Sequence, residues 1–257
     1  MIIKRDYIYT PKGKNRPLHI YLPDDYDRDD RRYPVMYFFD GHNLFFDEDA
    51  NYGKSWGLKE FLDKWDRKII LVGIECGHEG DERLSEYLPY KASLGFLWKF
   101  KPMGQQTMDW IVNEIKPMID REYRTMPQRE FTAIGGSSMG GLMAMFAGVR
   151  YNSVFSKAAC VSSAIGFCLR PLYKDIRNTV LDANTRMFLS WGTREAFGFL
   201  NPNKEDRTSR TYCWNKKAAN LIRKSGAAAE MYCQVGGKHC EADWEMQIPL
   251  FMEYLWE

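Results

Sequence analysis

Residues 131–148, FTAIGGSSMGGLMAMFAG, decide the fold. The run over 130–134 is typical of a buried strand, and 139–149 places apolar side chains at helical spacing. Two adjacent serines sit among four glycines where the strand meets the helix, with a G-x-S-x-G match centred on Ser138. The pattern predicts a sharp strand–turn–helix connection that lifts the Ser138 hydroxyl above the edge of a sheet. The alternative is a Gly/Ser loop that only caps a helix.

Steric arguments favour the first interpretation. Glycines on both sides of a strained turn allow the strand and the helix to approach without Cβ clashes. The helix also points its amino-terminal N–H groups at any negative charge that forms beside Ser138. This serine is therefore a candidate nucleophile.

Strands and helices alternate along the rest of the chain, which predicts an α/β fold with a mainly parallel sheet and helices on both faces. No linker separates two cores, so we expect a single domain over 1–257. Segment 84–107 has poor periodicity and is expected to pass over the active-site end of the sheet. The further predicted strands are 17–23, 34–40, 68–74, 155–162, 186–191 and 229–235, and the further helices 56–65, 108–123 (kinked by Pro117), 212–226 and 243–256.

Composition limits the classes of partner. The chain has 257 residues, 45% hydrophobic, and a net charge of +2, so no electrostatic footprint for nucleic acid or an anionic membrane is present. No apolar run is long enough to span a bilayer. The six cysteines lack metal-ligand spacing, which favours a reduced, cytoplasmic protein without a metal or a structural disulfide. Self-association is left open.

A serine hydroxyl needs a base to attack at neutral pH, and the chain has four histidines. His239 lies in a glycine-containing loop between the last predicted strand and the last helix, on the side from which a base reaches Ser138. His19 lies inside a predicted strand, whereas His42 and His78 lie in loops. Position therefore makes His239 the candidate base, although a lone loop histidine is more often an ordinary polar surface residue.

The third member of a catalytic triad is a carboxylate that holds the imidazole. Glu195 follows the predicted strand 186–191 by four residues. Asp206 is the alternative, and Asp182 fits poorly because it precedes its strand. The order Ser138, Glu195, His239 is that of the α/β-hydrolases.

These segments together resemble the putative-esterase family of α/β-hydrolases, which includes esterase D (S-formylglutathione hydrolase), enterochelin esterases, and feruloyl and acetyl-xylan esterases. The resemblance covers nearly the whole chain. Besides the helix before the turn, it rests on five segments: VMYFFDGHN (35–43), RLSEYLP (83–89), GGSSMGG (135–141), WGTRE (191–195) and GGKHCEADW (236–244).

The resemblance implies Ser138 as nucleophile, His239 as base and Glu195 as acid. Many relatives carry Asp in place of this Glu, which keeps Asp206 as an alternative acid. In the elbow geometry, one oxyanion donor is the backbone N–H of Met139, the residue after the nucleophile. The resemblance points to the backbone N–H of His42 as the second donor.

The predicted reaction is hydrolysis of a carboxylic ester through an acyl-enzyme on Ser138, with no cofactor and no metal. The alternatives are a thioesterase or S-formylglutathione-type hydrolase, which needs the same residues, and a non-catalytic binding protein on a hydrolase scaffold. The expected substrates are small or oligosaccharide-linked acyl esters of acetyl or cinnamoyl type. Trp56, Phe96 and Trp98 are candidate substrate contacts, because an aromatic pocket would suit an aromatic acyl group or a sugar face.

Overall fold

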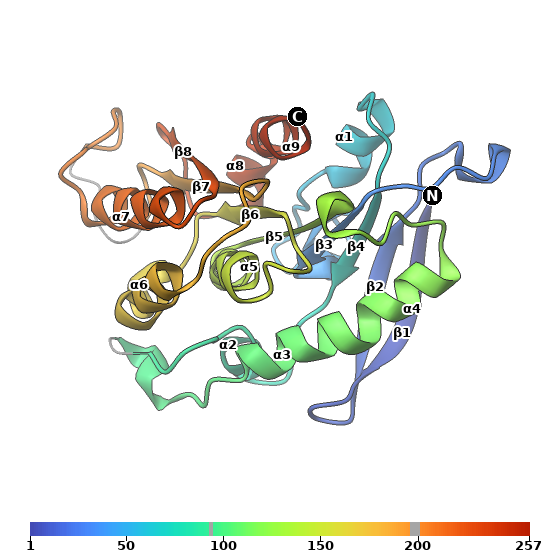
Figure 1. Ribbon diagram of the computed structural model, residues 1–257, viewed down its shortest axis with the longest axis horizontal. Coiled ribbons are helices and arrows are strands. Elements are labelled where there is room, and N and C mark those ends of the chain that lie inside the picture. Colours follow the sequence, from blue (N-terminus) through green and yellow to red (C-terminus); the bar gives the residue numbers. More distant parts are fainter. Residues whose placement is uncertain (93–94, 196–200) are drawn as a thin grey trace.

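A computed structural model describes residues 1–92, 95–195 and 201–257. Within this part of the chain, eight strands form one sheet in the order β1-β2-β4-β3-β5-β6-β7-β8 (Figure 1). The strands are β1 (Ile2–Tyr9), β2 (Lys14–Tyr21), β3 (Val35–Phe39), β4 (Ile70–Ile74), β5 (Thr132–Ser137), β6 (Lys157–Val161), β7 (Arg186–Gly192) and β8 (Ala228–Gln234).

Strand direction divides the sheet into two parts. β2 pairs antiparallel with both β1 and β4. From β4 through β3, β5, β6 and β7 to β8, every pairing is parallel. The carboxyl ends of these six strands therefore meet at one edge, where α/β folds place their sites.

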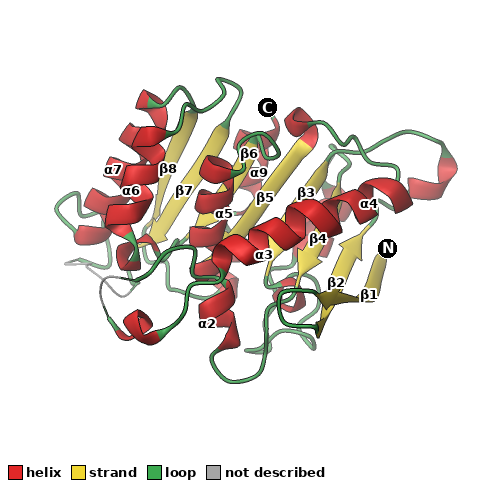
Figure 2. Ribbon diagram, turned by 60° about the horizontal axis from the view of Figure 1, so that its bottom comes forward, coloured by secondary structure: helices red, strands yellow, loops and turns green. Residues whose placement is uncertain are grey.

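Helices cover both faces of the sheet, as Figures 1 and 2 show. α1 (Leu58–Lys64), α8 (Glu241–Glu245) and α9 (Ile248–Trp256) pack on one face. The other face carries α3 (Gly104–Trp110), α4 (Lys116–Glu122), α5 (Met139–Arg150), α6 (Leu169–Asn178) and α7 (Arg210–Lys224). The short α2 (Glu82–Glu86) lies near one end of α3. The predicted α/β class is thus confirmed.

Buried strands are apolar on both sides because both faces are covered. All five residues of β3 and all five of β4 are buried. On the face of α9, Phe251 packs against Phe38 and Phe188, with ring centroids 6.4 and 6.1 Å apart. This packing fixes the central strands whose ends carry the site.

Several elements depart from the sequence-based prediction. The helix expected over 108–123 is longer, running from α3 through a π-helical segment, Ile111–Ile115, into α4, with Pro117 in the first turn of α4. A π segment is a known cause of helix distortion, so the irregularity precedes the proline. β1, α2 and α6 were not predicted, and the helix expected over 243–256 is divided into α8 and α9.

No helix in the described residues is long and apolar enough to cross a membrane.

Candidate active site

Ser138 occupies a sharp turn between β5 and α5. Its backbone has φ 58° and ψ −118°, a conformation that L-residues rarely adopt. The surrounding chain fixes the turn: the Ser138 N–H donates to the Val161 carbonyl at 3.0 Å, and its carbonyl accepts from the Ala164 N–H at 2.9 Å. Ser138 is half-buried. These hydrogen bonds hold its strained backbone in place at the edge of the sheet.

Two of the glycines predicted to permit this turn have no room for a side chain. A Cβ on Gly136 would lie 2.6 Å from the carbonyl carbon of Gly140, and one on Gly141 would lie 2.7 Å from the Val161 oxygen. Strand and helix therefore cross at backbone contact distance. Met139 is the first residue of α5, so its N–H lacks an intrahelical acceptor and is free to face an oxyanion.

His239 and Glu195 come together although 44 positions separate them in the sequence (239 − 195). His239 Nδ1 lies 3.4 Å from Glu195 Oε2. The glutamate side chain is 8% exposed and the histidine side chain 42%, so the imidazole reaches from a buried carboxylate toward the open pocket. In the described residues, no hydrogen bond joins Ser138 to His239, although both line the same pocket. Such catalytic contacts are often loose before substrate binds.

A buried hydrogen-bond chain holds Glu195. Its Oε1 accepts from the Ser162 hydroxyl at 2.5 Å and from the Gly192 N–H at 2.8 Å. The Ser162 hydroxyl in turn accepts from the Trp244 indole N–H at 2.9 Å. The Trp244 ring also contacts the His239 ring edge-on, with centroids 4.9 Å apart. One tryptophan therefore supports both the carboxylate and the imidazole.

The role of Ser162 was missed in the sequence, and that of Trp244 was present only as the H-x-x-x-x-W spacing after His239. Asp206, the alternative acid, accepts from the Thr208 N–H and hydroxyl at 2.8 and 2.7 Å in the loop before α7. The geometry favours Glu195 as the partner of His239, and its catalytic role stays a prediction.

The turn after β3 is held by an ion pair from α2. Arg83 donates two hydrogen bonds, each 2.7 Å, to the two carboxylate oxygens of Asp40. The Asp40 N–H donates to the Tyr87 hydroxyl at 3.2 Å, and Asp40 itself has φ 60°. Burial alone would raise the pKa of Asp40, but the Arg83 guanidinium outweighs it and lowers that pKa below its usual value. A charged Asp40 therefore anchors the turn Gly41–Asn43.

Backbone packing against β4 and two hydrogen bonds of Asn43 also hold the turn after β3. A Cβ on Gly41 would lie 2.6 Å from the Gly73 carbonyl carbon, so the turn rests on the backbone of β4. The Asn43 amide donates to Glu241 at the start of α8 at 3.3 Å. Its oxygen accepts from the Asn51 N–H at 3.0 Å. These contacts hold the segment that carries the His42 N–H, the predicted second oxyanion donor.

The ion pair and the hydrogen bond that hold Asp40 come from the segment RLSEYLP (83–89), a role that the sequence resemblance did not specify. Besides Arg83 and Tyr87, it contains Glu86, which is 1% exposed. Glu86 pairs with buried Arg16 at 2.9 Å and accepts from the Gly77 N–H at 2.8 Å. This short stretch thus ties the turn after β3 to the chain that follows β4.

The pocket beside Ser138 has a volume of about 260 Å³. Trp214 and Phe167 line it together with Ile165, and Asn215 adds a polar group. It lies between α7 and the loop after β6, and Ser138, Glu195 and His239 also line it. Its aromatic residues therefore differ from those predicted.

The structure corrects the expectation for Trp56. Its side chain is 1% exposed and packs against Phe38 and Trp244 in the core, with centroids 5.2 and 5.6 Å away, so it cannot line the pocket. Phe96 contacts the pocket residue Phe167 at 6.1 Å but is itself 57% exposed. Trp98 is 65% exposed and lies outside the pocket lining. High aromatic content does not distinguish core from pocket.

A model of the family described as "Putative esterase" matches residues 12–254. The chain belongs to the putative-esterase family. This esterase is 29% identical over 187 residues to the uncharacterized protein YbbA of Bacillus subtilis (strain 168), an alignment that covers 72% of this chain and 70% of that protein. The family membership predicted from the sequence is confirmed, and with it the class of enzyme: a carboxylic ester hydrolase of the serine hydrolase type.

Solved structures share the fold of the esterase. An IroE-like serine hydrolase from Shewanella oneidensis matches with a TM-score of 0.74 at 18% identity, covering 99% of this chain and 79% of that chain. A ferulic acid esterase matches with a TM-score of 0.68 at 17% identity, covering 99% and 96%. At these identities the likeness establishes the α/β-hydrolase architecture alone.

Proposed function

We propose that this esterase hydrolyses small or oligosaccharide-linked acyl esters through an acyl-enzyme on Ser138, with His239 as base and Glu195 as acid. One observation carries the proposal: a serine with strained backbone geometry at a helix start lines the same pocket as a histidine held 3.4 Å from a buried carboxylate. Nucleophile, base and orienting group are the three parts that acyl transfer requires.

The proposed mechanism follows from these positions. The Ser138 hydroxyl attacks the ester carbonyl carbon and gives its proton to His239 Nε2. The oxyanion that forms accepts hydrogen bonds from the N–H groups of Met139 and His42. Collapse of this intermediate expels the alcohol, which takes the proton from His239, and leaves an ester on Ser138.

Water then completes the cycle. His239 removes a proton from a water molecule that attacks the acyl-enzyme, and a second oxyanion forms in the same hole. Its collapse releases the carboxylic acid and returns the proton to Ser138. Throughout, the negative charge of Glu195 stabilises the imidazolium form of His239.

The pocket supports an aromatic acyl group over a long aliphatic one. Its volume of about 260 Å³ is below the range of roughly 300–1,000 Å³ that accommodates drug-sized ligands. Trp214 and Phe167 supply aromatic surface that suits a planar ring. The fold match to a ferulic acid esterase agrees with this choice. We therefore place cinnamoyl-type esters ahead of acetyl esters as the substrates.

The nucleophile is tested by Ser138→Ala. We expect the variant to fold, since only one hydroxyl is removed, and to lose hydrolysis of 4-nitrophenyl acetate to about a thousandth of the wild-type kcat or less. A fluorophosphonate probe should label the wild type on Ser138, as located by mass spectrometry of the digested protein. An adduct on another serine, or an active alanine variant, would remove Ser138 from the mechanism.

The substrate class is tested with a panel of 4-nitrophenyl esters of graded chain length, methyl ferulate, acetylated xylo-oligosaccharides and a thioester. We expect the highest kcat/KM with methyl ferulate. Trp214→Leu should lower kcat/KM for methyl ferulate more than for 4-nitrophenyl acetate, because the small acyl group does not reach the indole. Trp98→Leu, an exposed tryptophan outside the pocket, is the matched control. A preference for the thioester would move the proposal to a thioesterase.

A further inference from the structure

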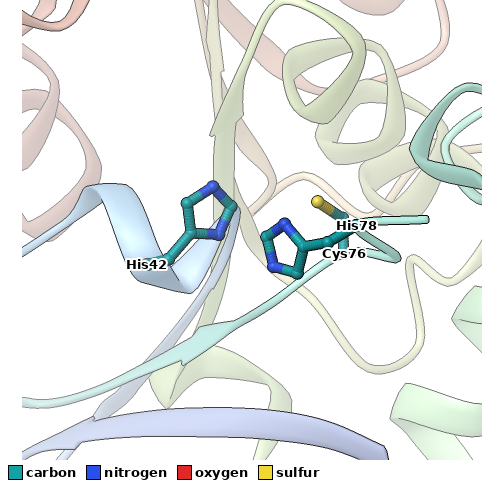
Figure 3. A group of neighbouring side chains, drawn as sticks. All are labelled: His42, Cys76 and His78. Atoms are coloured by element: carbon teal, nitrogen blue, oxygen red, sulfur yellow. The ribbon is translucent and has the colours of Figure 1, made fainter. Parts of the chain in front are cut away.

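A second group of reactive side chains lies where the turn after β3 meets the chain that follows β4. His42, Cys76 and His78 each offer one ligand atom, and these three atoms all lie within 4.8 Å of one another. Figure 3 shows the two imidazole rings next to each other, with the Cys76 sulfur beside His78; the ring planes are inclined at 71°. The ring centroids are 4.7 Å apart. The catalytic proposal uses none of these three side chains, since it requires only the backbone N–H of His42.

The buried histidine has an unsatisfied atom in this group. His42 is 5% exposed, and its Nδ1 is buried without a hydrogen-bond partner in the described structure. Its other ring nitrogen, Nε2, lies 2.9 Å from the Asn51 side-chain amide. A buried polar atom without a partner is costly and needs an explanation, and a cation at Nδ1 would supply one.

The two histidines have the hydrogen-bond partners that a metal-binding histidine needs on its other ring nitrogen. His78 Nε2 lies 2.8 Å from Glu75 Oε2, which leaves Nδ1 of His78 to face the group. A carboxylate behind a ligating histidine fixes the ring and its tautomer. Asn51 supports His42 in the same way when its side-chain amide is oriented so that the oxygen accepts a hydrogen bond from Nε2–H of His42. The hydrogen-bond network decides between the two orientations of the amide.

We propose that His42 Nδ1, His78 Nδ1 and Cys76 Sγ bind one divalent transition-metal cation of the zinc and cobalt type. Two imidazoles and one thiolate are a ligand set for such cations, and a water completes four-coordination. Tetrahedral bonds of about 2.0 Å to nitrogen and 2.3 Å to sulfur bring ligand atoms to roughly 3.3–3.7 Å apart. His78 supplies the needed movement, because 47% of its side chain is exposed.

Binding removes one proton from the protein. Cys76 is buried beside the turn after β3, and on coordination its thiol proton passes to the buffer while the sulfur binds as thiolate. The cation would link the turn Gly41–Asn43 to the chain after β4. It would therefore stabilise the folded protein without taking part in ester hydrolysis, so its test is separate from that of the proposed function.

The test is titration of the purified, chelator-treated protein with Co²⁺, followed by absorption spectroscopy. We expect one equivalent to bind, with a sulfur-to-cobalt charge-transfer band in the near ultraviolet and visible bands of tetrahedral intensity. Cys76→Ser should abolish the charge-transfer band. His78→Gln, at a half-exposed position, and Glu75→Gln, behind it, should each weaken binding by about 10–100-fold.

Cys213→Ser, which alters an exposed cysteine on α7, is the control and should bind like the wild type. Circular dichroism and hydrolysis of 4-nitrophenyl acetate verify that each variant is folded. Absence of the charge-transfer band in the wild type, or its survival in Cys76→Ser, would overturn the proposal. Equal affinity in wild type and in both His78→Gln and Glu75→Gln would overturn it as well.

Discussion

Glu195 shows how much of this site depends on the environment of one side chain. Its carboxylate has a hydrogen bond from Ser162, another from the Gly192 N–H, and His239 on its second oxygen. A carboxylate with these partners has little freedom to rotate, so the imidazole is presented in one orientation. The supporting hydrogen-bond chain begins at Trp244, whose indole N–H donates to the Ser162 hydroxyl.

The identity of the acid gives the first prediction. Glu195→Gln keeps the size of the side chain but removes the charge that stabilises the imidazolium. We expect kcat to fall by about 10⁴-fold, as for comparable triad substitutions. Asp206→Asn, which keeps an oxygen for the Thr208 donors, should change kcat little. The opposite ranking of the two variants, measured with the same ester, would assign the acid to Asp206.

Ser162 gives a second prediction. Ser162→Ala removes the hydroxyl between Trp244 and Glu195 while the backbone, with φ 42°, remains equally demanding for alanine. If about 1.4 kcal/mol of orienting energy is lost in the transition state, kcat falls about tenfold. KM should stay near the wild-type value, since the hydroxyl is engaged in supporting Glu195. A change in KM alone would mean that Ser162 contacts the substrate and does not position the acid.

The turn after β3 and the helix α2 act as one unit. Arg83 and Tyr87 hold Asp40, while Glu86 holds Arg16 and Gly77. A five-residue helix has little stability of its own, so these buried bonds stabilise it and the turn together. The oxyanion donor predicted at His42 thus depends on an element that contributes no atom to the reaction.

Breaking this unit gives the third prediction. Arg83→Gln leaves the buried Asp40 carboxylate without its guanidinium, which should cost about 3 kcal/mol of unfolding free energy. Asp40→Asn combined with Arg83→Gln should recover part of that loss, because no unpaired charge is then buried.

The folded pKa of Asp40 is lowered, so its ion pair stabilises the protein above the unfolded pKa and this contribution is lost as pH falls.

The difference in melting temperature between wild type and Arg83→Gln should therefore shrink on acidification. Differential scanning calorimetry across the acid range measures it. A difference that is constant with pH would mean that the ion pair is not the source of the stability.

The sequence predicted the buried central strands but missed β1 and α6. β3 and β4 are nearly continuous apolar runs because both faces of the sheet are covered. β1 was missed because it is a partly exposed edge strand with Lys4, Arg5 and Asp6 in its middle. α6 was missed although its buried residues, Leu172, Tyr173 and Ile176, follow helical spacing.

Side-chain contacts between segments that are far apart in the chain could not be predicted from the sequence either. Ser162 meets Glu195 from 33 positions away and Trp244 from 82. No local pattern encodes such pairs, so the sequence named the three proposed triad residues but not the chain that holds two of them. The catalytic roles and the single domain over 1–257 stay predictions, whereas the fold and the family are confirmed.

The parallel strands of the sheet place the proposed catalytic residues at one edge. β3 leads to the turn with His42, β5 to Ser138, β7 to Glu195 and β8 to His239. Four segments that are far apart in the chain therefore meet because parallel strands end on the same side. Reactivity is a property of the assembled sheet, and none of these segments would carry it alone.

The pH dependence of the intact enzyme gives the fourth prediction. His239 must be neutral to accept the Ser138 proton, so kcat/KM should fall on acidification with a limiting slope of one. A flat profile from about pH 4 to 8 would remove histidine as the base. EDTA should leave the profile unchanged, because no proposed step uses a metal. Activity lost to EDTA and restored by a divalent cation, in a protein that circular dichroism shows to stay folded throughout, would contradict the serine mechanism.

The contact between Gly41 and Gly73 has an evolutionary consequence. A Cβ at position 41 would lie 2.6 Å from the Gly73 backbone, and one at position 73 would lie 2.9 Å from the Gly41 Cα. Because backbone meets backbone, no second substitution nearby can make room for a side chain at either position. We expect a library of random variants selected for activity to lack replacements at both sites, even among heavily mutated survivors. The two positions would stay fixed while the pocket walls diverge, which would let new substrates arise without disturbing the turn beside the nucleophile.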